Sequence, residues 1–475
     1  MTAGDDSMPP SHDAPESAAR VSRREMMRQS AAALASGALA SGALASGALA
    51  SGALASGALA FGPTVANAQE STEPSGAPLE GTPRPGQPGR DYTPVTTPNG
   101  VTLPFRIVDG VKVFHLVAEP FVHEFAPGLR SQCWGYNGRT PGPTIEAVDG
   151  DRVRIYVTNR LPEPTSVHWH GVILPSGMDG VAGLSQAPIP VHATFKYEFT
   201  LRQHGTLMYH AHYDEMVQQG LGLMGMFVIH PRNAARRPDR DFALLSSEWR
   251  VPIGASRPDP NEMTDFNILT FNGKAFPATE PLPMQLGERI RIRLGNLSAM
   301  SHHTIHVHGL HWRVVATDGG DIPEAGQRPE ATTLVPVGTT RTVEFVADNP
   351  GDWAMHCHMT HHVMNQMGHN GTNLVGADAR AIDALTSKLL PDYMTMGEAG
   401  MGGMGEMGMP LPGGSISMLG GEGPHGHIDM GGMFTILKVR ERLMPGGDPG
   451  WYVNPPGTEA VEATADDLRR DGLAP

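Results

Sequence analysis

The sequence has few cysteines and few charged residues. Of 475 residues only two are cysteine, Cys133 and Cys357, and only 18% are charged. If Cys357 binds a metal ion, no pair remains for an intramolecular disulfide, and Cys133 is expected to be a buried free thiol. Lys and Arg together number 35 against 49 Asp and Glu, a formal net charge of -14. This shortage of basic side chains argues against a nucleic-acid partner, because phosphate binding needs concentrated Lys and Arg.

Glycine and proline are abundant, with 58 and 42 residues. Combined with the low charge, this composition favours strands and turns over helices, so an all-β fold is expected. The run from Gly150 to Val157 alternates apolar and polar residues, a pattern typical of strands with one buried face. The length allows two or three domains.

Residues 1–68 are predicted to be an export signal. Arg23 and Arg24 precede five copies of Ser-Gly-Ala-Leu-Ala at residues 36–60, and residues 66–68 supply the small side chains that a signal peptidase recognises. The pattern resembles a twin-arginine signal, the route for proteins exported already folded, and it predicts a periplasmic or extracellular protein. An uncharged stretch of this length could instead anchor the chain in a membrane. Its Gly and Ser content favours cleavage, after which no membrane contact is expected.

Three further segments lack the alternation of strands. Residues 69–103 are rich in Pro, Gly, Thr and Ser and are predicted to be a linker. Residues 391–433 form an insertion in which methionines are spaced among glycines. Residues 441–475 are acidic and proline-rich, and we expect a flexible tail.

Three motifs occur twice in the chain, in the same order. Gly-Asp-Arg-Val-Arg-Ile at 150 returns as Gly-Glu-Arg-Ile-Arg-Ile at 287, His-Trp-His-Gly at 168 as His-Val-His-Gly at 306, and His-Ala-His at 210 as His-Cys-His at 356. Repeats of this kind indicate duplicated structural units. The chain is therefore predicted to contain two copies of one β domain, at 104–232 and 240–440.

The segment from His356 to Met367 has the composition of a blue copper site. Cys357 is followed by His362 and Met367 at intervals of five residues, and a His2Cys set with a weak axial methionine forms an electron-transferring copper centre. His303, three residues before His306, is the expected second histidine, although its neighbour His302 is an alternative. In the first repeat these four ligand positions hold Thr165, Ala211, Met216 and Leu221, so no blue site is expected there.

Eight further histidines form four His-Xaa-His units. Residues i and i+2 of a strand share a face, so each unit presents two imidazoles side by side. A single unit could be a hydrogen-bonded core pair, but four at repeated positions, one enclosing Cys357, predict metal binding. The eight are His168, His170, His210, His212, His306, His308, His356 and His358.

With these motifs the sequence resembles the multicopper oxidase family over residues 104–440. The resemblance implies two cupredoxin-like Greek-key β-sandwich or barrel domains and four coppers per subunit. By position, the type 1 copper would be bound by His303, Cys357 and His362, with Met367 axial, and the type 2 copper by His168 and His306. The type 3 pair would be bound by one set of His170, His210 and His358, and another of His212, His308 and His356. Asp179, nine residues after His170, stands where family members place an acidic residue near these coppers; alternatively it is an ordinary turn residue before Gly180.

The spacing of the motifs is similar to that of the two-domain, small laccase-like type, whose type 1 copper lies in the second domain. In that type the three-copper cluster is shared between domain 1 of one subunit and domain 2 of the next. A head-to-tail interface closes only in a ring, so a homotrimer is predicted.

The resemblance implies that a donor is oxidised one electron at a time at the type 1 copper while O2 is reduced to water at the cluster. The donor would be a phenol, an aromatic amine or Cu(I), which methionine thioethers of the insertion could bind; the last would give a role in copper tolerance. The insertion could instead be a low-complexity surface loop. Two alternative functions are a copper nitrite reductase, which would need its blue-copper cysteine in the first domain, and a non-catalytic copper-binding cupredoxin protein.

Overall fold

The computed structural model describes residues 83–252, 255–264, 266–365, 384–385, 388–389, 420–444 and 447–473. The predicted export signal, Met367 and the larger part of the methionine-rich insertion lie outside these residues. Strands dominate the described chain, and the helices α2 (Glu215–Gly220) and α5 (Ala465–Arg470) have six residues each. None of the described helices is long and apolar enough to cross a membrane. The all-β prediction is confirmed.

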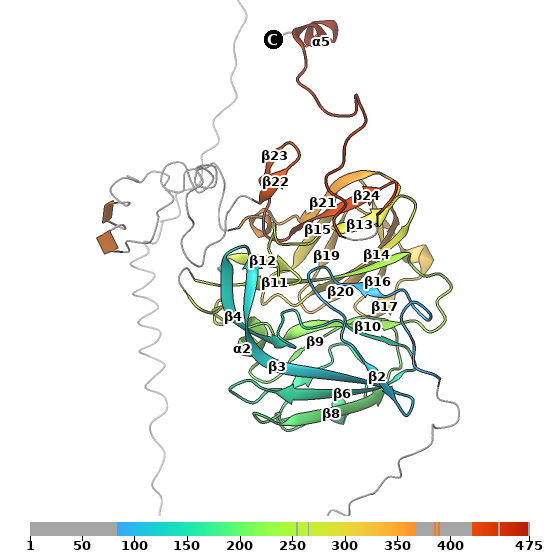
Figure 1. Ribbon diagram of the computed structural model, residues 1–475, viewed down its shortest axis with the longest axis vertical. Coiled ribbons are helices and arrows are strands. Elements are labelled where there is room, and N and C mark those ends of the chain that lie inside the picture. The colour runs from blue at the N-terminus through green and yellow to red at the C-terminus, as the bar shows by residue number, and fades with distance from the viewer. Residues whose placement is uncertain are drawn as a thin grey trace, which may run out of the picture. The chain divides into compact units, whose positions relative to one another are not determined.

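The first half of the chain folds into two facing sheets, here called the N-terminal β-domain (Figure 1). One sheet has the order β2-β3-β6-β8, with β4 added on β3: β2 (Arg106–Val108), β3 (Val111–Ala126), β4 (Leu129–Tyr136), β6 (Arg152–Asn159) and β8 (Thr194–Thr200). The other has the order β5-β10-β9-β7: β5 (Ile145–Val148), β10 (Met224–His230), β9 (Gly205–Ala211) and β7 (Val167–His168). The short η1 (Ser176–Met178) lies between β7 and β8.

The second half forms the C-terminal β-domain, also with two main sheets. The larger contains β11 (Arg240–Trp249), β14 (Arg289–Asn296), β20 (Thr340–Val346), β16 (Trp312–Thr317) and β17 (Gly320–Asp321), with β12 (Ile268–Phe271) on β11 and β18 (Pro329–Glu330) on β16. The smaller has the order β13 (Leu282–Gln285), β24 (Phe434–Arg440), β21 (Gly351–Cys357), β15 (His303–Val307) and β19 (Thr332–Val335). Two single-turn segments, η2 (Glu324–Gly326) and η3 (Thr360–Val363), and the hairpin β22 (Gly421–Gly423) with β23 (Gly426–Ile428) complete it.

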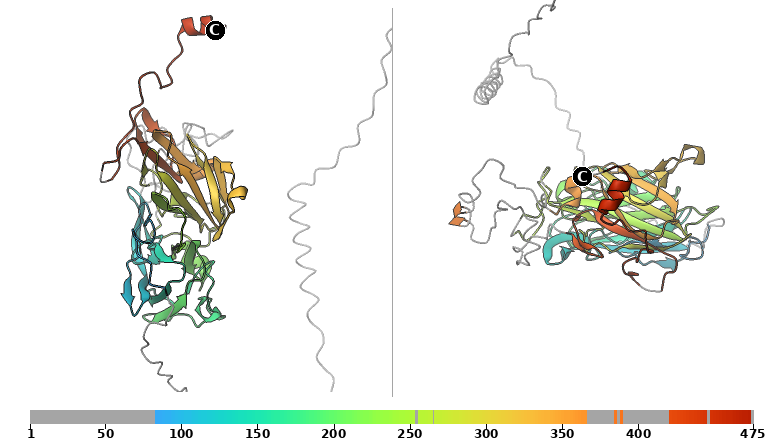
Figure 2. Two further views of the ribbon diagram at one scale, coloured as in Figure 1. Left: turned by 90° about the vertical axis from the view of Figure 1, so that its right-hand side faces the viewer. Right: turned by 90° about the horizontal axis from the view of Figure 1, so that it is seen from above.

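Alternation along the repeated strands builds a separate core in each domain. On β6, Val153, Ile155 and Val157 are fully buried while the residues between them are partly exposed. Burying a side chain of this size stabilises a fold by roughly 1.5–3 kcal/mol. The two main cores draw on residues 103–229 and 242–439, ranges close to the predicted domains at 104–232 and 240–440. Figure 2 shows the blue-to-green and the yellow-to-red strands as two groups.

The two domains share a strand order and a register. In the first, β10 pairs with β5 in parallel and with β9 antiparallel; in the second, β24 pairs with β13 and β21 in the same senses. His168 faces His210 across β7 and β9, as His306 faces His356 across β15 and β21. The motif repeat of the sequence is thus a repeat of backbone geometry.

A third core joins the two domains. It packs side chains of β3, β4, β9 and β10 against side chains of β11 and β12, and it encloses Cys133, which is fully buried and unpaired as predicted. Burial raises the pKa of its thiol well above the usual range. The ion pair of Arg293 with Asp241 lies in the same region, and Arg293 also donates to Thr206 Oγ1 at 2.8 Å.

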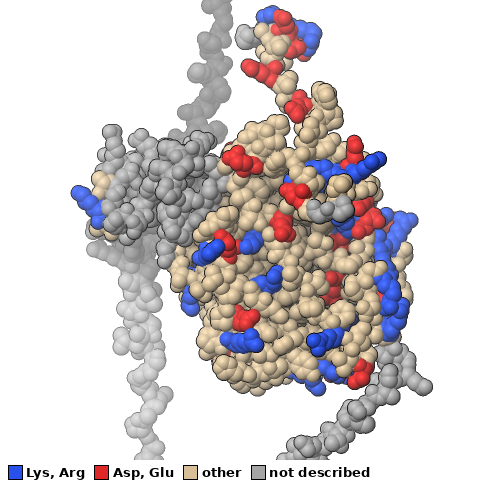
Figure 3. Space-filling view, in the orientation of Figure 1, with Lys and Arg blue, Asp and Glu red and all other residues tan. Residues whose placement is uncertain are grey.

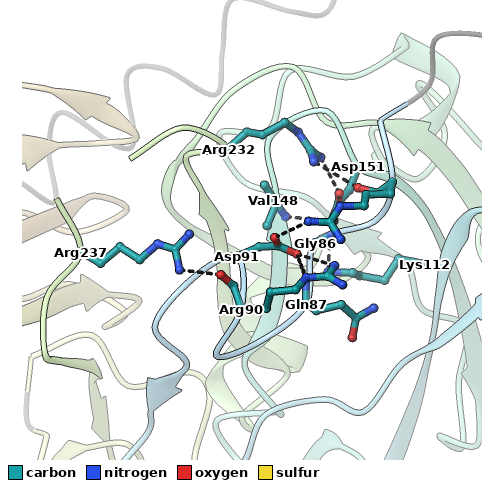
Figure 4. A network of polar contacts seen from close by, with 10 residues as sticks. Gly86, Gln87, Arg90, Asp91, Lys112, Val148, Asp151, Arg232 and Arg237 are labelled. Atoms are coloured by element: carbon teal, nitrogen blue, oxygen red, sulfur yellow. Dashed lines mark hydrogen bonds and ion pairs between the residues drawn. The ribbon is translucent and has the colours of Figure 1, made fainter. Parts of the chain in front are cut away.

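The described part of the predicted linker is extended and firmly attached. Its β1 (Val95–Thr96) pairs in parallel with β11, so a strand that precedes the N-terminal domain extends the larger sheet of the C-terminal domain. Upstream, the backbone N–H of Gly86 donates to Asp151, a buried carboxylate that also pairs with Lys112 and Arg232 (Figure 4). Asp91 pairs with Arg90 in the same network, which lowers the pKa of that carboxyl to about 2.

The described part of the predicted tail also contacts the C-terminal domain. Arg440 pairs with Asp352 at 2.5 Å, and Asp352 accepts from the backbone N–H of Tyr452 at 2.7 Å. Further on, Thr464 caps α5 with its hydroxyl. On the face drawn in Figure 3, Lys and Arg are interspersed with Asp and Glu over broad uncharged areas, in keeping with the low charge content.

Candidate metal centres

Four histidines of the N-terminal domain converge at one end of the sheet β5-β10-β9-β7. We call His168, His170, His210 and His212 the first quartet. Trp169, between the first two, is fully buried against Tyr197 and other core aromatics, so alternation turns the flanking imidazoles away from the core. His168 lies 5.4 Å, ring centre to ring centre, from both His210 and His212. Nitrogens of His168, His170 and His210 lie within 4.8 Å of one another, close enough to bind a metal ion together.

The C-terminal domain repeats this arrangement with His306, His308, His356 and His358, the second quartet. Ring centres of His306 lie 4.9 Å from His308 and 5.3 Å from His358. His308 Nε2 and His356 Nε2 are 3.2 Å apart. Among the described residues, the close ring contacts of each quartet's histidines with other histidines stay within that quartet.

Backbone contacts select the nitrogen that each histidine presents. His168 Nδ1 lies 2.9 Å from Asp179 O, and His306 Nδ1 lies 2.8 Å from Ala331 O, so both offer Nε2 to a metal. His170 is reversed, because its Nε2 donates to Gly338 O of the C-terminal domain at 2.9 Å and its Nδ1 faces His210. A backbone contact on one ring nitrogen fixes the tautomer and orients the other toward a metal.

Burial favours the neutral form of four of these eight imidazoles. It lowers the pKa of His210 to about 3. Burial, together with repulsion between neighbouring rings, also lowers the pKa of His170, His308 and His356. A neutral imidazole has the lone pair that a metal requires, and the donor set therefore fits copper.

The third cluster lies on the other side of β21 and consists of His303, Cys357 and His362. Cys357 Sγ is 3.7 Å from His303 Nδ1 and 3.5 Å from His362 Nδ1, and the two nitrogens are 3.1 Å apart. Burial lowers the pKa of His303 to about 3 and raises that of the Cys357 thiol. A thiol with two imidazoles suits a blue copper ion. Met367, the predicted axial ligand, lies outside the described residues.

In the N-terminal domain, the positions that correspond to this third cluster are occupied by side chains that cannot form a His2Cys site. Thr165 Oγ1 donates to Gln218 Oε1 at 2.7 Å, and Gln218 Nε2 donates to Glu163 and to the backbone of Pro164. Ala211, the counterpart of Cys357, is fully buried. A single cluster of the His2Cys type is therefore found in the described chain.

Asp179 lies beside the first quartet. Its carboxylate is 3.4 Å from His168 Nδ1, in addition to the backbone contact. Gly180 makes this turn possible, because its φ is +82° and a Cβ there would lie 1.7 Å from Val167 O. Asp179 is therefore both a turn residue and a neighbour of the first quartet.

Two contacts of the clusters were missed by sequence reasoning. Glu215 at the start of α2 lies 3.5 Å from His210 and 3.8 Å from His212, and its position three residues after His212 was the available signal. Ser298 Oγ lies 2.6 Å from His303 Nε2, and no motif marks it. Among the other histidines, His302 Nδ1 accepts from the backbone of Val337, which leaves His303 as the residue at Cys357.

Comparisons with known proteins agree with this geometry. Two sequence models, each described as multicopper oxidase, match residues 121–234 and 252–374. Copper resistance protein A of Escherichia coli is 28% identical over 332 residues, which cover 58% of this chain and 52% of that protein. Copper resistance protein A of Pseudomonas syringae pv. tomato is 30% identical over 241 residues, covering 40% and 39%. The chain thus spans about half or less of these curated relatives.

Among solved structures, the multicopper oxidase mgLAC matches with a TM-score of 0.52 and 25% identity, covering 73% of this chain and 91% of that one. The blue copper oxidase of Nitrosomonas europaea has a TM-score of 0.52 at 23% identity, over 69% and 85%, and supports the fold. The predicted cupredoxin fold is confirmed. Two matched domains and three histidine-rich clusters lead to one conclusion: the chain belongs to the multicopper oxidase family.

Proposed function

We propose that this protein is an oxidase that couples one-electron oxidation of a donor to the four-electron reduction of O2 to water. The observation that carries the proposal is the placement of Cys357 between His356 and His358. Its side chain points to His303 and His362, while its two neighbours belong to the second quartet. The thiolate ligand is therefore linked through a single peptide bond on each side to a histidine of the other centre.

The metal-binding side chains would be divided among the coppers as the resemblance to the family implies. His303, Cys357 and His362, with Met367, would bind the type 1 copper, and His168 and His306 the type 2 copper. One type 3 copper would be bound by His170, His210 and His358, the other by His212, His308 and His356. When bound, these four coppers would supply storage for the electrons that O2 reduction needs.

The cluster would form between subunits. Eight histidines are needed for it, yet the described close ring contacts among them join only members of the same quartet. The second quartet of one subunit would therefore meet the first quartet of the next, and repetition of that contact closes a ring. We propose a homotrimer.

Asp179 would move protons to the cluster. Its carboxylate lies 3.4 Å from His168 Nδ1 and is about one-third exposed, so it contacts both a ligand and solvent. Water formation consumes protons, and a carboxylate in this position can carry them.

Cu(I) is the donor that we favour over phenols and aromatic amines. Two relatives carry the name copper resistance protein A, and the predicted insertion at 391–433 is rich in thioethers, which bind Cu(I) well. Oxidation of Cu(I) outside the cytoplasm, after export through the signal at residues 1–68, would give copper tolerance. The insertion lies mostly outside the described residues, as does the signal.

Copper content, the absorption spectrum and oxygen uptake of the purified protein test the proposal. We expect four coppers per chain, a blue thiolate-to-copper band, and one O2 consumed for four electrons from Cu(I) or a phenol. A protein that binds fewer coppers and consumes no O2 with either donor would refute it.

A further inference from the structure

A cavity of about 360 Å³ lies between the two domains and is lined in part by the loop that leads to His303. Its walls come from α2, from the segment that follows β11 and from the loop that precedes β15. Four of its lining residues are methionines: Met216, Met224, Met263 and Met300. Three of the five methionines that are exposed in the described chain line this one cavity, at 57–61% exposure. Exposure of an apolar methionine side chain to water is unfavourable. A cluster of such side chains in one cavity therefore indicates a ligand-binding site.

Two oxygen atoms in the walls of the cavity have no hydrogen-bond partner among the described residues. Glu248 is 6% exposed, and its Oε1 accepts from the backbone N–H groups of Met300 and Ser301 at 2.6 and 2.9 Å. Its Oε2 is buried without a partner, and so is Gln219 Oε1. A buried polar oxygen left unpaired costs roughly 1–3 kcal/mol, and more if it is charged. A bound cation would remove that cost.

The charge of the walls also favours a cation. One basic side chain, Arg250, lines the cavity, against four acidic side chains: Glu215, Glu248, Asp259 and Glu262. Glu262 uses one oxygen to accept from the backbone of Met263 and Thr264, so its carboxylate holds a methionine-bearing loop in place. The cavity therefore combines soft sulfur with anionic oxygen.

That combination selects among cations. Mg²⁺ and Ca²⁺ take oxygen ligands, whereas thioethers bind Cu(I), a soft ion. We propose that this cavity is the binding site of the Cu(I) substrate, with thioethers of Met216, Met263 and Met300 as ligands and Glu248 as the compensating charge. The inference rests on the proposed oxidase function and adds to it a place where the donor binds.

The loop at 297–301 connects the cavity to the type 1 ligands. Met300 lines the cavity, Glu248 fixes Met300 and Ser301 through their N–H groups, and Ser298 Oγ contacts His303 Nε2 at 2.6 Å. An electron leaving the cavity thus has a short bonded route to a type 1 ligand through the ring edge that faces away from Cys357.

The reaction at this site would be a one-electron transfer. Each bound Cu(I) loses one electron to the type 1 centre and becomes Cu(II), with no bond to a carbon or oxygen atom made or broken. Four such events deliver the electrons that reduce one O2, with four protons from solvent, to two waters. Cu(II) is a harder ion than Cu(I) and binds thioethers less well, so oxidation also promotes release of the product.

The experiment uses the copper-loaded full-length protein and Ag(I), a redox-inert ion with the ligand preferences of Cu(I). Calorimetric titration compares wild type with the double variant Met263→Leu and Met300→Leu, which keeps apolar volume and removes two sulfurs. Glu248→Gln is the second variant, because an amide oxygen still accepts from Met300 and Ser301. Met444→Leu, 82% exposed and outside the cavity, is the matched control. Methionines of the insertion bind Ag(I) equally in all four proteins.

We expect both cavity variants to lose one tight Ag(I) equivalent, or to bind it at least about tenfold more weakly, with the blue band retained. The ratio of KM for Cu(I) to KM for a phenol should rise by the same factor. Unchanged Ag(I) binding and an unchanged ratio would overturn the inference. A wild-type protein that reduces no O2 with a phenol would instead refute the proposed function, so the two failures are distinguishable. If the variants change only phenol oxidation, the cavity binds an apolar donor and the Cu(I) assignment is wrong.

Discussion

Cys357 Sγ lies 3.5 Å from His362 Nδ1, although His362 is five positions later in the chain. The turn η3 returns the chain to the same side of β21, so that one strand end and one short turn supply both side chains. The thiol is fully buried and the imidazole is partly buried, so the surrounding side chains hold both in place.

Cys357→Ser should abolish the blue absorption and remove one copper of the four. A hydroxyl is a poor ligand for a soft metal, so the type 1 site is lost while the quartets remain. Absorption spectroscopy and metal analysis provide the measurement. Cys133→Ala is the control, since that buried thiol lies in the interdomain core and should leave the spectrum unchanged. Equal loss of blue colour in both variants would contradict the assignment.

Two inactive variants should restore activity when they assemble together. His168→Ala removes a first-quartet ligand and His308→Ala a second-quartet ligand, so each trimer of one kind lacks complete clusters. Random mixing in a ring would pair an intact second quartet with an intact first quartet at about one contact in four. We expect about a quarter of wild-type oxygen uptake after co-expression. No recovery, together with a monomer by light scattering, would exclude the shared cluster.

Asp179→Ala should lower kcat for O2 reduction by about a hundredfold, the lower end for loss of a proton-transfer group, without changing copper content. The backbone carbonyl of residue 179 still contacts His168, so the type 2 ligand stays oriented. Stopped-flow reoxidation of the reduced protein measures the step directly. Asp348→Ala removes an exposed acid and serves as the control. If both variants reoxidise at the wild-type rate, Asp179 has only its turn role.

His123 should make the folded protein sensitive to mild acid. Burial lowers its pKa from 6.5 to about 4, while its Nε2 donates to Gly273 O across the domain interface. The unfolded chain therefore takes up a proton more readily, and stability present above pH 6.5 is lost as the pH falls toward 4. The loss amounts to about 3 kcal/mol.

His123→Gln keeps a donor for Gly273 and removes the titration, so its unfolding free energy should depend less on pH between 6.5 and 4. Urea unfolding of wild type and variant at several pH values gives the difference. His115→Gln changes an exposed histidine and should follow the wild-type curve. Parallel curves for wild type and His123→Gln would show that the pKa of the imidazole is the same in the folded and the unfolded chain.

The fold and the histidine clusters could be predicted because the sequence patterns that specify them are local and occur twice in the chain. Alternation assigns Trp169 and Cys357 to one side of a strand and their neighbours to the other, and the repeat shows which histidines correspond. Other features depend on contacts between distant segments. Met216, Met263 and Met300 line one cavity only because the domains pack together, and β1, with two residues, has no periodicity to detect.

Because β1 pairs with β11, cleavage of the connector between the two domains would not separate them. The strand that extends the C-terminal sheet is joined covalently to the N-terminal domain, while Arg237 in the connector donates to the backbone of Arg90. A protease that cleaves between Pro231 and Pro238 would leave two fragments interlocked by a donated strand. The chain should therefore unfold as one cooperative unit, and neither domain should be stable when expressed alone.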